Sequence, residues 1–454
     1  MNKTLPLLAC LLTWGLMSLT TARGQAIYAT PYTFVTIAGS AGIPESGADG
    51  TNGFASFYYP EAVAVATNHN LYVVDAIAND IRQVAPLGTN WVVTTIAGTN
   101  YPGGGSDDGT NQAAQFYGPA SIALDRFNNL YVADGGNNTL RKITPVGTNW
   151  VVTTIAGTAS PNTSGGSADG TNGVAQFYYP SGIAVDAAGN LYVADTYNDT
   201  IRRAAPVGTN WVVTTIAGTA GRRGSDDGTN QNAQFFLPDG IAVDGSGNLY
   251  VADGGNNTIR KMTPVGTNWV VSTIACSILL GANLTDGTNT DAQFNSPATI
   301  ALDASGNLYV ADTGNNAIRL VAPIGTNWVV TTLAGGYNGP DGTSGTNDGT
   351  GPDAQFNSPY GIAVDAAGNL YVADTGNSTI REGYLATAAP NLAISLSAGN
   401  VMISWPGSGF TLQTNADLTT TNWGSYSGLI TSGSGTNSVT LSPLGGALFF
   451  RLTN

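Results

Sequence analysis

One motif, present in six copies, constrains the fold of this chain more than any other feature. The tyrosine of LYV(A/V)D recurs at intervals of 59, 61, 58, 59 and 62 residues, at Tyr72, Tyr131, Tyr192, Tyr250, Tyr309 and Tyr371. A fixed period of this size marks one supersecondary unit that is repeated along the chain. The 454 residues are therefore interpreted as an array of similar units, because a repeat overrides an estimate of the number of domains from chain length.

Each unit has the pattern of β-strands. Apolar, β-branched segments such as GIAVD, LYVAD and NWVVTTIAG alternate with short turns rich in Asn, Asp and Gly. No long segment has the 3.6-residue period of an amphipathic helix. The sequence predicts four antiparallel strands per unit, and such units repeated around an axis form a β-propeller, an all-β fold.

The two ends of the array indicate how the ring closes. The sixth unit supplies three strands before the sequence departs from the repeat at Glu382. The strand that it lacks, one ending in TIAG, stands alone near the other end of the chain, at Tyr32–Gly39. If they did not pair, the sixth unit and this strand would each expose an unpaired sheet edge. We therefore expect a six-bladed β-propeller in which an N-terminal strand, Tyr32–Ala38, pairs with the last blade.

The repeated residues also resemble a known family. GNLYVADTGNSTIR and its copies look like the NHL repeat, and the order AG…DG…AQF…P…GIAVD…LYVAD…IR is similar to that of secreted bacterial NHL-repeat propellers. The resemblance covers about four-fifths of the chain and implies the propeller fold. The units are longer than compact propeller repeats, and the extra length lies in loops, where function is usually located.

Composition divides the chain into four parts. Residues 1–26 read as a secretory signal peptide, with Lys3, an apolar run and small residues at Gly24 and Ala26; a retained anchor helix is the alternative. Residues 27–386 form the predicted propeller, and 387–391 the linker. In 392–454, short strand-like segments such as VMISW and FTLQT predict a small β-sandwich, loosely similar to fibronectin-type accessory modules.

Charge and cysteine content limit the partners and the location. The net charge is −14, and loss of Lys3 and Arg23 with the signal would make it −16, which opposes binding to nucleic acid. Only Cys276 would then remain, so no intrachain disulfide is expected. No apolar run after Ile27 is long enough for a membrane span. We expect a secreted or cell-envelope (periplasmic or extracellular) monomer whose partner is an extracellular protein or polysaccharide.

Residues present in every unit are predicted to serve the blades. The aspartate that ends LYV(A/V)D should accept hydrogen bonds from turn amides or from the arginine seven residues later. The tryptophan of GTNWVV, which five units have, should pack between blades. The DGT aspartates are typical of turns. The alternative is that they bind a divalent cation such as Ca²⁺, which is the one cofactor we consider. These sets are Asp75, Asp134, Asp195, Asp253, Asp312 and Asp374; Arg82, Arg141, Arg202, Arg260, Arg319 and Arg381; and Asp49, Asp108, Asp169, Asp227, Asp286 and Asp348.

The position after each unit's proline differs from unit to unit. It should lie near the mouth of the central channel, and it holds Glu61, Ala120, Ser181, Asp239, Ala298 and Tyr360. Glu61 and Asp239 fall on opposite blades, and their segments PEAVAV and PDGIAVD resemble metal-binding segments of six-bladed lactonases of the gluconolactonase type. That resemblance implies a metal site at Glu61 and Asp239, but the asparagines expected on other blades are absent. The alternative is two solvated carboxylates.

The residues before the prolines are aromatic in the first four units and polar in the last two. Exposed tyrosines offer flat apolar faces and hydroxyl groups that suit sugar rings or an extended peptide. The sequence predicts a ligand-binding face that comprises Tyr58, Tyr59, Tyr117, Tyr178, Tyr179 and Tyr360. The alternative is that these tyrosines pack between blades beneath the loops.

The common catalytic constellations are missing from the sequence. The sole histidine, His69, lies in a predicted turn, no GxSxG elbow precedes a helix, and no phosphate-binding loop is present. We therefore expect a non-catalytic binding or scaffold protein without a cofactor, whose propeller face binds protein or carbohydrate. The alternative is a metal-dependent gluconolactonase-like hydrolase that uses Glu61 and Asp239.

Overall fold

The computed structural model describes two separate sets of strands. It covers residues 32–41, 47–99, 104–159, 165–276, 284–336 and 344–385, and parts of 393–453. The chain divides into two compact units, Met1–Leu385 and Ala386–Asn454. The predicted signal peptide, residues 1–26, and the predicted linker, 387–391, lie outside the described residues.

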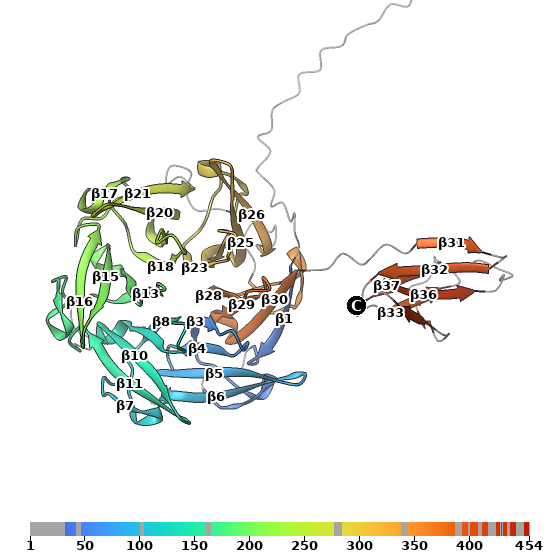
Figure 1. Cartoon of the computed structure of the whole chain (residues 1–454), viewed down its shortest axis with the longest axis horizontal. Helices are drawn as coiled ribbons and strands as arrows, with labels where there is room; N and C mark the ends of the chain where they lie inside the picture. Colours follow the sequence, from blue (N-terminus) through green and yellow to red (C-terminus); the bar gives the residue numbers. More distant parts are fainter. Residues whose placement is uncertain are drawn as a thin grey trace, which may run out of the picture. The chain divides into compact units, whose positions relative to one another are not determined.

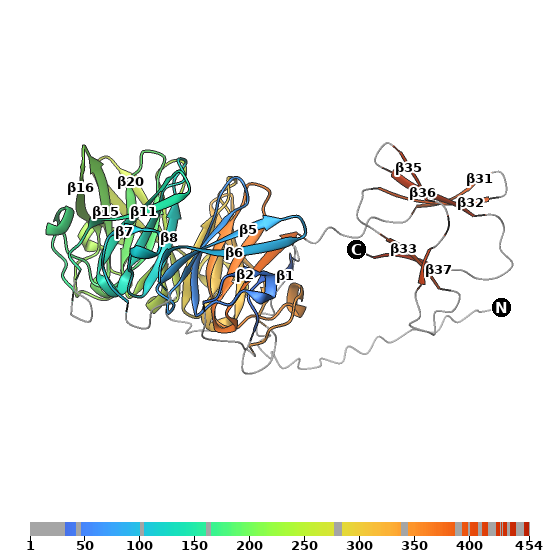
Figure 2. The same ribbon diagram turned by 90° about the horizontal axis from the view of Figure 1, so that it is seen from below.

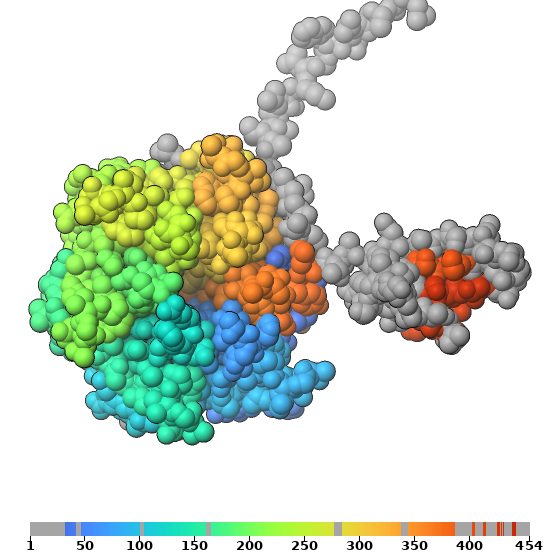
Figure 3. Space-filling view, viewed as in Figure 1, coloured from blue at the N-terminus to red at the C-terminus, as the bar shows by residue number. Residues whose placement is uncertain are grey.

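The first unit is a six-bladed β-propeller (Figures 1 and 2), as the repeats predict. The chain runs once around the ring, so that successive blades form successive sectors in Figure 3. The strands of blades 1 to 3 are β2 (Gly50–Thr51), β3 (Pro60–Val65), β4 (Leu71–Asp75), β5 (Asp80–Leu87), β6 (Asn90–Gly98), β7 (Gly109–Thr110), β8 (Pro119–Leu124), β9 (Leu130–Asp134), β10 (Thr139–Val146), β11 (Asn149–Ala156), β12 (Gly170–Thr171), β13 (Pro180–Val185), β14 (Leu191–Asp195), β15 (Thr200–Val207) and β16 (Asn210–Ala217).

Blades 4 to 6 repeat the same pattern. Their strands are β17 (Gly228–Thr229), β18 (Pro238–Val243), β19 (Leu249–Asp253), β20 (Thr258–Val265), β21 (Asn268–Ala275), β22 (Gly287–Thr288), β23 (Pro297–Leu302), β24 (Leu308–Asp312), β25 (Ala317–Ile324), β26 (Asn327–Gly335), β27 (Gly349–Thr350), β28 (Pro359–Val364), β29 (Leu370–Asp374), β30 (Thr379–Leu385) and the closing strand β1 (Tyr32–Ala38).

Each blade has one strand more than the sequence predicts. The order in blade 1 is β2-β6-β5-β4-β3, with β3 innermost, and the other blades follow it. The extra outer strand is the Gly-Thr pair of the DGT element, for example Gly50 and Thr51, which pair with Val93 and Val92. Two residues are too few for a period-2 pattern to show in the sequence. The DGT element is therefore both the end of a loop and the outer edge of a blade.

Strand β1 closes the ring. It pairs antiparallel with β30, from Tyr32 opposite Leu385 to Ala38 opposite Ile380, and on its other side with β27. Phe34 of β1 is fully buried and its ring meets that of Phe356 edge to face, with centroids 5.1 Å apart. In Figure 1 the blue β1 lies beside the orange β30. The predicted closure is confirmed.

A buried ion-pair network holds each blade together. In blade 4, the guanidinium of Arg260 donates to Asp253 at 2.7 Å and to the DGT aspartate Asp227 at 2.9 Å, and it lies 5.1 Å above the ring of Phe235. The second oxygen of Asp253 accepts the amide of Phe236. The other blades repeat this arrangement, with Arg–Asp distances of 2.7–3.3 Å. The predicted role of the repeated aspartates is confirmed.

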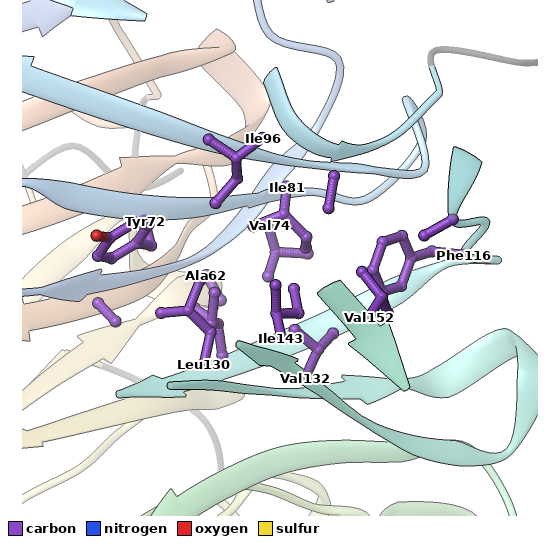
Figure 4. Packing of buried hydrophobic residues seen from close by; sticks show 14 of the residues in the cluster. Ala62, Tyr72, Val74, Ile81, Ile96, Phe116, Leu130, Val132, Ile143 and Val152 are labelled. Atoms are coloured by element: carbon purple, nitrogen blue, oxygen red, sulfur yellow. The ribbon is translucent and has the colours of Figure 1, made fainter. Parts of the chain in front are cut away.

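The core lies between neighbouring blades. Tyr72 of blade 1 meets Trp150 of blade 2 edge to face at 5.5 Å, and the same pair recurs around the ring. At the blade 5 junction Tyr309 meets Tyr32 of β1 instead of a tryptophan. Figure 4 shows apolar side chains of blades 1 and 2 packed face to face. The tryptophans therefore serve blade packing, as predicted.

Short 3₁₀ turns join the strands, and no α-helix occurs among the described residues. The turns that follow the DGT element are η1 (Asn52–Phe54), η2 (Asn111–Ala113), η4 (Asn172–Val174), η6 (Asn230–Asn232), η9 (Asn289–Asp291) and η11 (Gly351–Asp353). The turns that follow the second inner strand of a blade are η3 (Gly135–Asn137), η5 (Thr196–Asn198), η7 (Gly254–Asn256), η10 (Thr313–Asn315) and η12 (Thr375–Asn377). No helix within the described part of the chain has the length and apolar character needed to cross a membrane.

The second unit consists of short strands in two small sheets. One sheet has the order β31-β32-β36-β35 and the other β34-β33-β37. The strands are β31 (Ala393–Ser397), β32 (Asn400–Pro406), β33 (Thr411–Asn415), β34 (Gly424–Ser425), β35 (Thr431–Gly433), β36 (Thr436–Leu441) and β37 (Phe449–Thr453). The predicted strands are present, and the sandwich packing of the two sheets remains a prediction.

Candidate functional site at the channel mouth

The six inner strands surround the central channel. A narrow cavity along it is lined by residues of β3, β8, β13, β18, β23 and β28, including Ala62, Ile122, Ile241 and Ile362. We call the end at which these strands begin the channel mouth. Because the residue after each proline is the second of its inner strand, the variable residues of the six units meet there.

In blades 2 to 6, the residue before the proline is held by the preceding blade. Tyr179 has a left-handed backbone with φ of 50°, and its amide donates to Oδ1 of Asn138 at 2.7 Å. The corresponding amide of Leu237 donates to Asp199 at 2.9 Å. Non-glycine residues rarely adopt this conformation, so the repeated bond from the neighbouring blade is what stabilises it. This hydrogen bond fixes the direction in which the side chain of Tyr179 projects from the backbone.

Three tyrosines of blade 3 form an aromatic cluster beside the channel mouth. Tyr179 stacks on Tyr197, with ring centroids 5.0 Å apart and planes 19° apart. Tyr178 meets the same ring edge to face at 5.1 Å. Tyr197 belongs to the turn η5 and is 44% exposed. The cluster therefore presents aromatic surface to solvent at a fixed angle.

A carboxylate and a tyrosine from non-adjacent blades meet across the channel mouth. The hydroxyl of Tyr360, on blade 6, donates a hydrogen bond to Oδ2 of Asp239, on blade 4. Next to them the hydroxyls of Ser181 and Thr196 are hydrogen-bonded, and Thr196 also donates to the carbonyl of Pro238 at 2.7 Å. These polar groups come from three blades and are tied into one network.

Burial changes the acidity of both mouth carboxyls. Desolvation, with a contribution from the nearby charge of Asp239, raises the pKa of Glu61 to about 8. Desolvation raises the pKa of Asp239 to about 6, although the hydrogen bonds from Tyr360 and Ser181 lower it. Glu61 is therefore mostly protonated at neutral pH, whereas Asp239 is mostly ionised.

The aromatic cluster and the Asp239 network line one pocket. Its volume is about 390 Å³, and its lining residues are Tyr179, Ser181, Thr196, Tyr197, Leu237, Asp239, Gly254, Gly255, Ser296, Pro297, Ala298, Thr313 and Tyr360. Pockets of this size accept small organic ligands. Flat rings, hydroxyls and a carboxylate in one cavity suit a ligand that is apolar on one face and rich in hydroxyls at its rim.

The structure brings together some of the predicted ligand-binding residues. Tyr179 and Tyr360 line the pocket together with Asp239, which the sequence offered as a metal ligand. Tyr178 supports the cluster from behind through Tyr197. The opposite carboxyl, Glu61, lies close enough to Asp239 for their charges to interact.

The other predicted tyrosines are not part of this pocket. The amides of Tyr58 and Tyr117 donate to the buried aspartates of their own blades, and Tyr117 lies directly over Gly136 of the following turn. Tyr59 is 42% exposed but belongs to blade 1, outside the pocket lining. Tyr58, Tyr59 and Tyr117 thus lie outside the pocket lining, and their role in ligand binding stays a prediction.

The sequence interpretation missed Tyr197. Its position in the other units is Ile77, Gly136, Gly255, Gly314 and Gly376, so blade 3 alone has an aromatic residue there. The same comparison between units that exposed Glu61 and Asp239 would have found it.

Over the described residues, no three or more His, Cys, Asp or Glu side chains are grouped as they would be around a metal ion. Oδ2 of Asp239 accepts the hydroxyl of Tyr360, and the DGT aspartates face the buried arginines. His69 lies in an exposed turn, with Nδ1 3.6 Å from Asp365 of blade 6.

Comparison with known families identifies the repeat. Residues 177–203 and 237–262 match the NHL repeat, and residues 272–383 match the Teneurin NHL domain. These segments contain the LYVAD motifs of blades 3 to 6. The propeller of this chain is therefore built of NHL repeats.

Curated relatives that match part of this chain are much longer. The chain is 27% identical over 339 residues to Protein SUPPRESSOR OF QUENCHING 1, chloroplastic, of Arabidopsis thaliana, covering 71% of this chain and 30% of that protein. It is 31% identical over 222 residues to Teneurin-4 of Mus musculus, covering 44% and 8%. It is 28% identical over 342 residues to NHL repeat-containing protein 2 of Bos taurus, covering 67% and 44%. The chain thus spans less than half the length of each.

Solved structures with the same fold are more distant in sequence. One is a protein of unknown function from Bacteroides thetaiotaomicron, with TM-score 0.57, 21% identity and coverage of 78% of this chain and 75% of that chain. Another is described as an auxiliary nutrient binding protein from the same organism, with TM-score 0.57, 18% identity and coverage of 79% and 77%. At these identities the likeness shows the fold alone.

Proposed function

We propose that the protein is a secreted, non-catalytic binding protein that takes a carbohydrate into the pocket at the channel mouth. The observation that carries the proposal is the stacked pair Tyr179 and Tyr197, set beside Asp239 and Tyr360 in one cavity. Sugar rings have apolar faces that stack on aromatic rings and equatorial hydroxyls that bond to carboxylates and hydroxyls. Both kinds of group are present here.

Two further features support a binding role. The negative net charge of −14 favours neutral ligands over polyanions. One solved structure of the same fold is described as an auxiliary nutrient binding protein. A binding role is therefore compatible with this fold. A protein ligand is the other partner that such a face could take, and the experiment below distinguishes it.

The test is electrophoresis of the purified chain through native gels that contain a neutral polysaccharide: xylan, a β-glucan or galactomannan. A polysaccharide that binds retards the wild type, and Tyr179→Ala and Tyr197→Ala should each reduce the affinity roughly ten-fold or more, because each removes half of the stacking platform. Tyr384→Ala, at an exposed tyrosine of β30, is the matched control and should migrate with the wild type. Equal retardation of all variants would contradict the proposal, and capture of a protein without any polysaccharide binding would replace it.

The alternative function is a metal-dependent hydrolase of the gluconolactonase type. It is favoured by one observation, the approach of Glu61 and Asp239 across the channel mouth. Native mass spectrometry after exposure to calcium, manganese or zinc tests it, with the double variant Glu61→Ala/Asp239→Ala beside the wild type. A single bound ion that the variant loses would favour the hydrolase; no ion, or several weak ones that the variant retains, would remove that alternative.

A further inference from the structure

A second pocket lies between blades 2 and 3, at the opposite ends of the inner strands from the channel mouth. Its volume is about 390 Å³. It is formed where β8 and β13 end and turn back, by Leu124, Asp125, Arg126, Phe127, Asn129, Tyr131, Lys142, Val185, Asp186, Ala187, Ala188, Gly189, Pro206 and Trp211. We call it the blade 2–3 groove.

The walls of the groove are mainly apolar. Leu124, Val185 and Trp211 form its side, and Phe127 stands 66% exposed at its edge. Phe127 thus extends the apolar wall of the groove to its rim.

The two aspartates of the groove are already hydrogen-bonded within their turns. Asp125 accepts the amides of Phe127 and Asn129 at 2.8 and 2.9 Å, and its other oxygen accepts the Asn129 side chain and the Tyr131 hydroxyl. Asp186 is bonded in the same way in the next blade. Their hydrogen-bonding capacity is directed at the turns, so they offer little to a ligand.

Two cations of the groove have no carboxylate partner. The guanidinium of Arg126 lies 4.8 Å from the ring centroid of Phe127, and the ammonium of Lys142 lies 5.8 Å from that of Tyr131. Within the described ranges, neither forms an ion pair within 4.0 Å, whereas the six repeated arginines are all paired inside the blades. Arg126 and Lys142 can therefore meet an anionic ligand, while Asp125 and Asp186 of the same lining are held by their turns.

The architecture of the propeller does not require these side chains. At the turn after the inner strand, blade 2 reads DRFNN, whereas blades 3, 4, 5 and 6 read DAAGN, DGSGN, DASGN and DAAGN. The position of Lys142 is occupied by Leu320 in blade 5, on a strand of the same length. Lys142 has cationic counterparts in Arg203 and Lys261, whereas the pair Arg126 and Phe127 occurs in blade 2 alone. Because the other blades fold without that pair, a ligand explains it more readily than stability does.

We propose that the blade 2–3 groove binds a small organic anion that joins a carboxylate to an aromatic ring. The ring would lie against Phe127 and Trp211, and the carboxylate would meet Arg126 and Lys142. The volume fits a ligand of this size, and charge-assisted hydrogen bonds to the carboxylate supply its orientation. The inference is independent of the carbohydrate pocket, since the two share no residue.

Isothermal titration calorimetry of the full chain with indole-3-acetate, its uncharged amide and tryptamine tests the charge requirement. The carboxylate should bind, the amide should bind at least ten-fold more weakly, and the cationic amine should not bind. Added salt should weaken the binding of the carboxylate, because the ion pairs are near the surface. Equal binding of the carboxylate and the amide would overturn the proposal, as would no binding of either.

Variants taken from the other blades test the location. Arg126→Ala/Phe127→Ala gives blade 2 the alanines of blade 3, and Lys142→Leu gives it the leucine of blade 5, so both changes use residues that equivalent positions already hold. Each should weaken the binding of indole-3-acetate at least five-fold while thermal unfolding followed by circular dichroism stays unchanged. The matched control is Lys261→Leu, whose ammonium lies 5.7 Å from Tyr250 in blade 4. If Lys261→Leu weakens binding as much as Lys142→Leu, or if neither groove variant does, the assignment is wrong.

Discussion

At the scale of single residues, the protein uses charge in two opposite ways. The repeated arginines are buried between two carboxylates, as Arg260 is between Asp253 and Asp227. At the channel mouth, by contrast, Glu61 and Asp239 form no ion pair within 4.0 Å among the residues that the structure describes, and burial raises the pKa of each carboxyl. The first arrangement maintains a blade, and the second leaves acidic groups available at a pocket.

The first prediction concerns the arginine network. Arg260→Met should destabilise the propeller by about 3–5 kcal/mol, because the side chain is fully buried and its removal leaves the carboxylate of Asp253 buried without its cation. The neighbouring Lys261→Met, which removes a charge without an ion pair, should change stability by no more than about 0.5 kcal/mol. Urea denaturation of both variants measures the difference. A loss for Arg260→Met as small as that for Lys261→Met would show that the network contributes little.

The second prediction concerns the pH dependence that Glu61 confers. Its pKa is about 8 in the folded protein against an ordinary value of 4.5, so the folded state holds the proton more tightly than the unfolded state does. The stability that protonated Glu61 confers is complete below about pH 4.5 and falls as the pH rises toward 8. Glu61→Gln keeps the neutral form at every pH and should remove this fall.

Denaturation of wild type and Glu61→Gln at several pH values between 5 and 9 measures the effect. One pKa unit corresponds to about 1.4 kcal/mol, and the channel leaves the side chain partly in contact with solvent, which reduces the effect. We expect the wild type to lose about 1–2 kcal/mol relative to the variant across this range. Parallel pH profiles would contradict the raised pKa.

At the scale of the strand, β1 has a role that no other strand has. Each of blades 1 to 5 obtains its long outer strand from the same repeat, whereas blade 6 obtains it from residues that lie more than 300 positions earlier in the chain, as in the bond from Tyr32 to Gly368. This one strand therefore joins the first and last repeats. Its apolar side chains stabilise the ring as a whole.

The third prediction tests this closure. Phe34→Ala removes a fully buried ring that packs on Phe356 and should cost about 3–5 kcal/mol. Hydrogen exchange should show the loss of protection first in β1 and β30, because opening the ring there requires no other blade to unfold. Thr36→Ser, at an exposed position of β1, keeps the hydroxyl that donates to Asp348; it is the control and should leave both measurements near those of the wild type. Uniform loss of protection across all blades would instead indicate that the ring opens as a single unit.

At the scale of the whole molecule, the propeller is a ring in which the position of the chain ends matters little. Tyr32 lies opposite Leu385 in the β1–β30 pair, as Asn327 lies opposite Ile324 in the β26–β25 pair, where two residues make the turn. A two-residue turn could therefore join Leu385 directly to Tyr32. Blade 6 would then be built from continuous chain like the other five.

The fourth prediction is a circular permutation. A chain that runs from residue 47 to 385, then Gly-Thr, then 32–41 should fold to the same propeller as the linear chain 32–385. Its midpoint of thermal unfolding should be equal or a few degrees higher, because the closing strand becomes a local hairpin and the entropy of closing a long loop is no longer lost. Calorimetry of the two proteins gives the comparison. A permuted chain that unfolds well below the linear one would show that the native chain ends contribute to stability beyond the pairing of β1.

Much of this architecture could be predicted because it is repeated. A side chain that serves a blade appears six times at one spacing, so Asp253 and Arg260, seven residues apart, carry the same signal as their five counterparts. The displaced strand Tyr32–Ala38 could be found for the same reason, since it completes a pattern known from the other units. The fifth strand of each blade could not, because two residues of pairing leave no periodicity.

The sequence alone determined the ring, its closure and the identity of the variable mouth residues. Only the tertiary structure decided which of these residues meet: Tyr360 bonds to Asp239, 121 positions away, and Tyr197 stacks on Tyr179 whereas Tyr117 covers a glycine. The physical reason is that repetition encodes contacts within a blade and between adjacent blades at fixed spacings. Contacts across the channel mouth depend on the curvature of the closed ring and on side chains that occur once, and no spacing in the sequence records them.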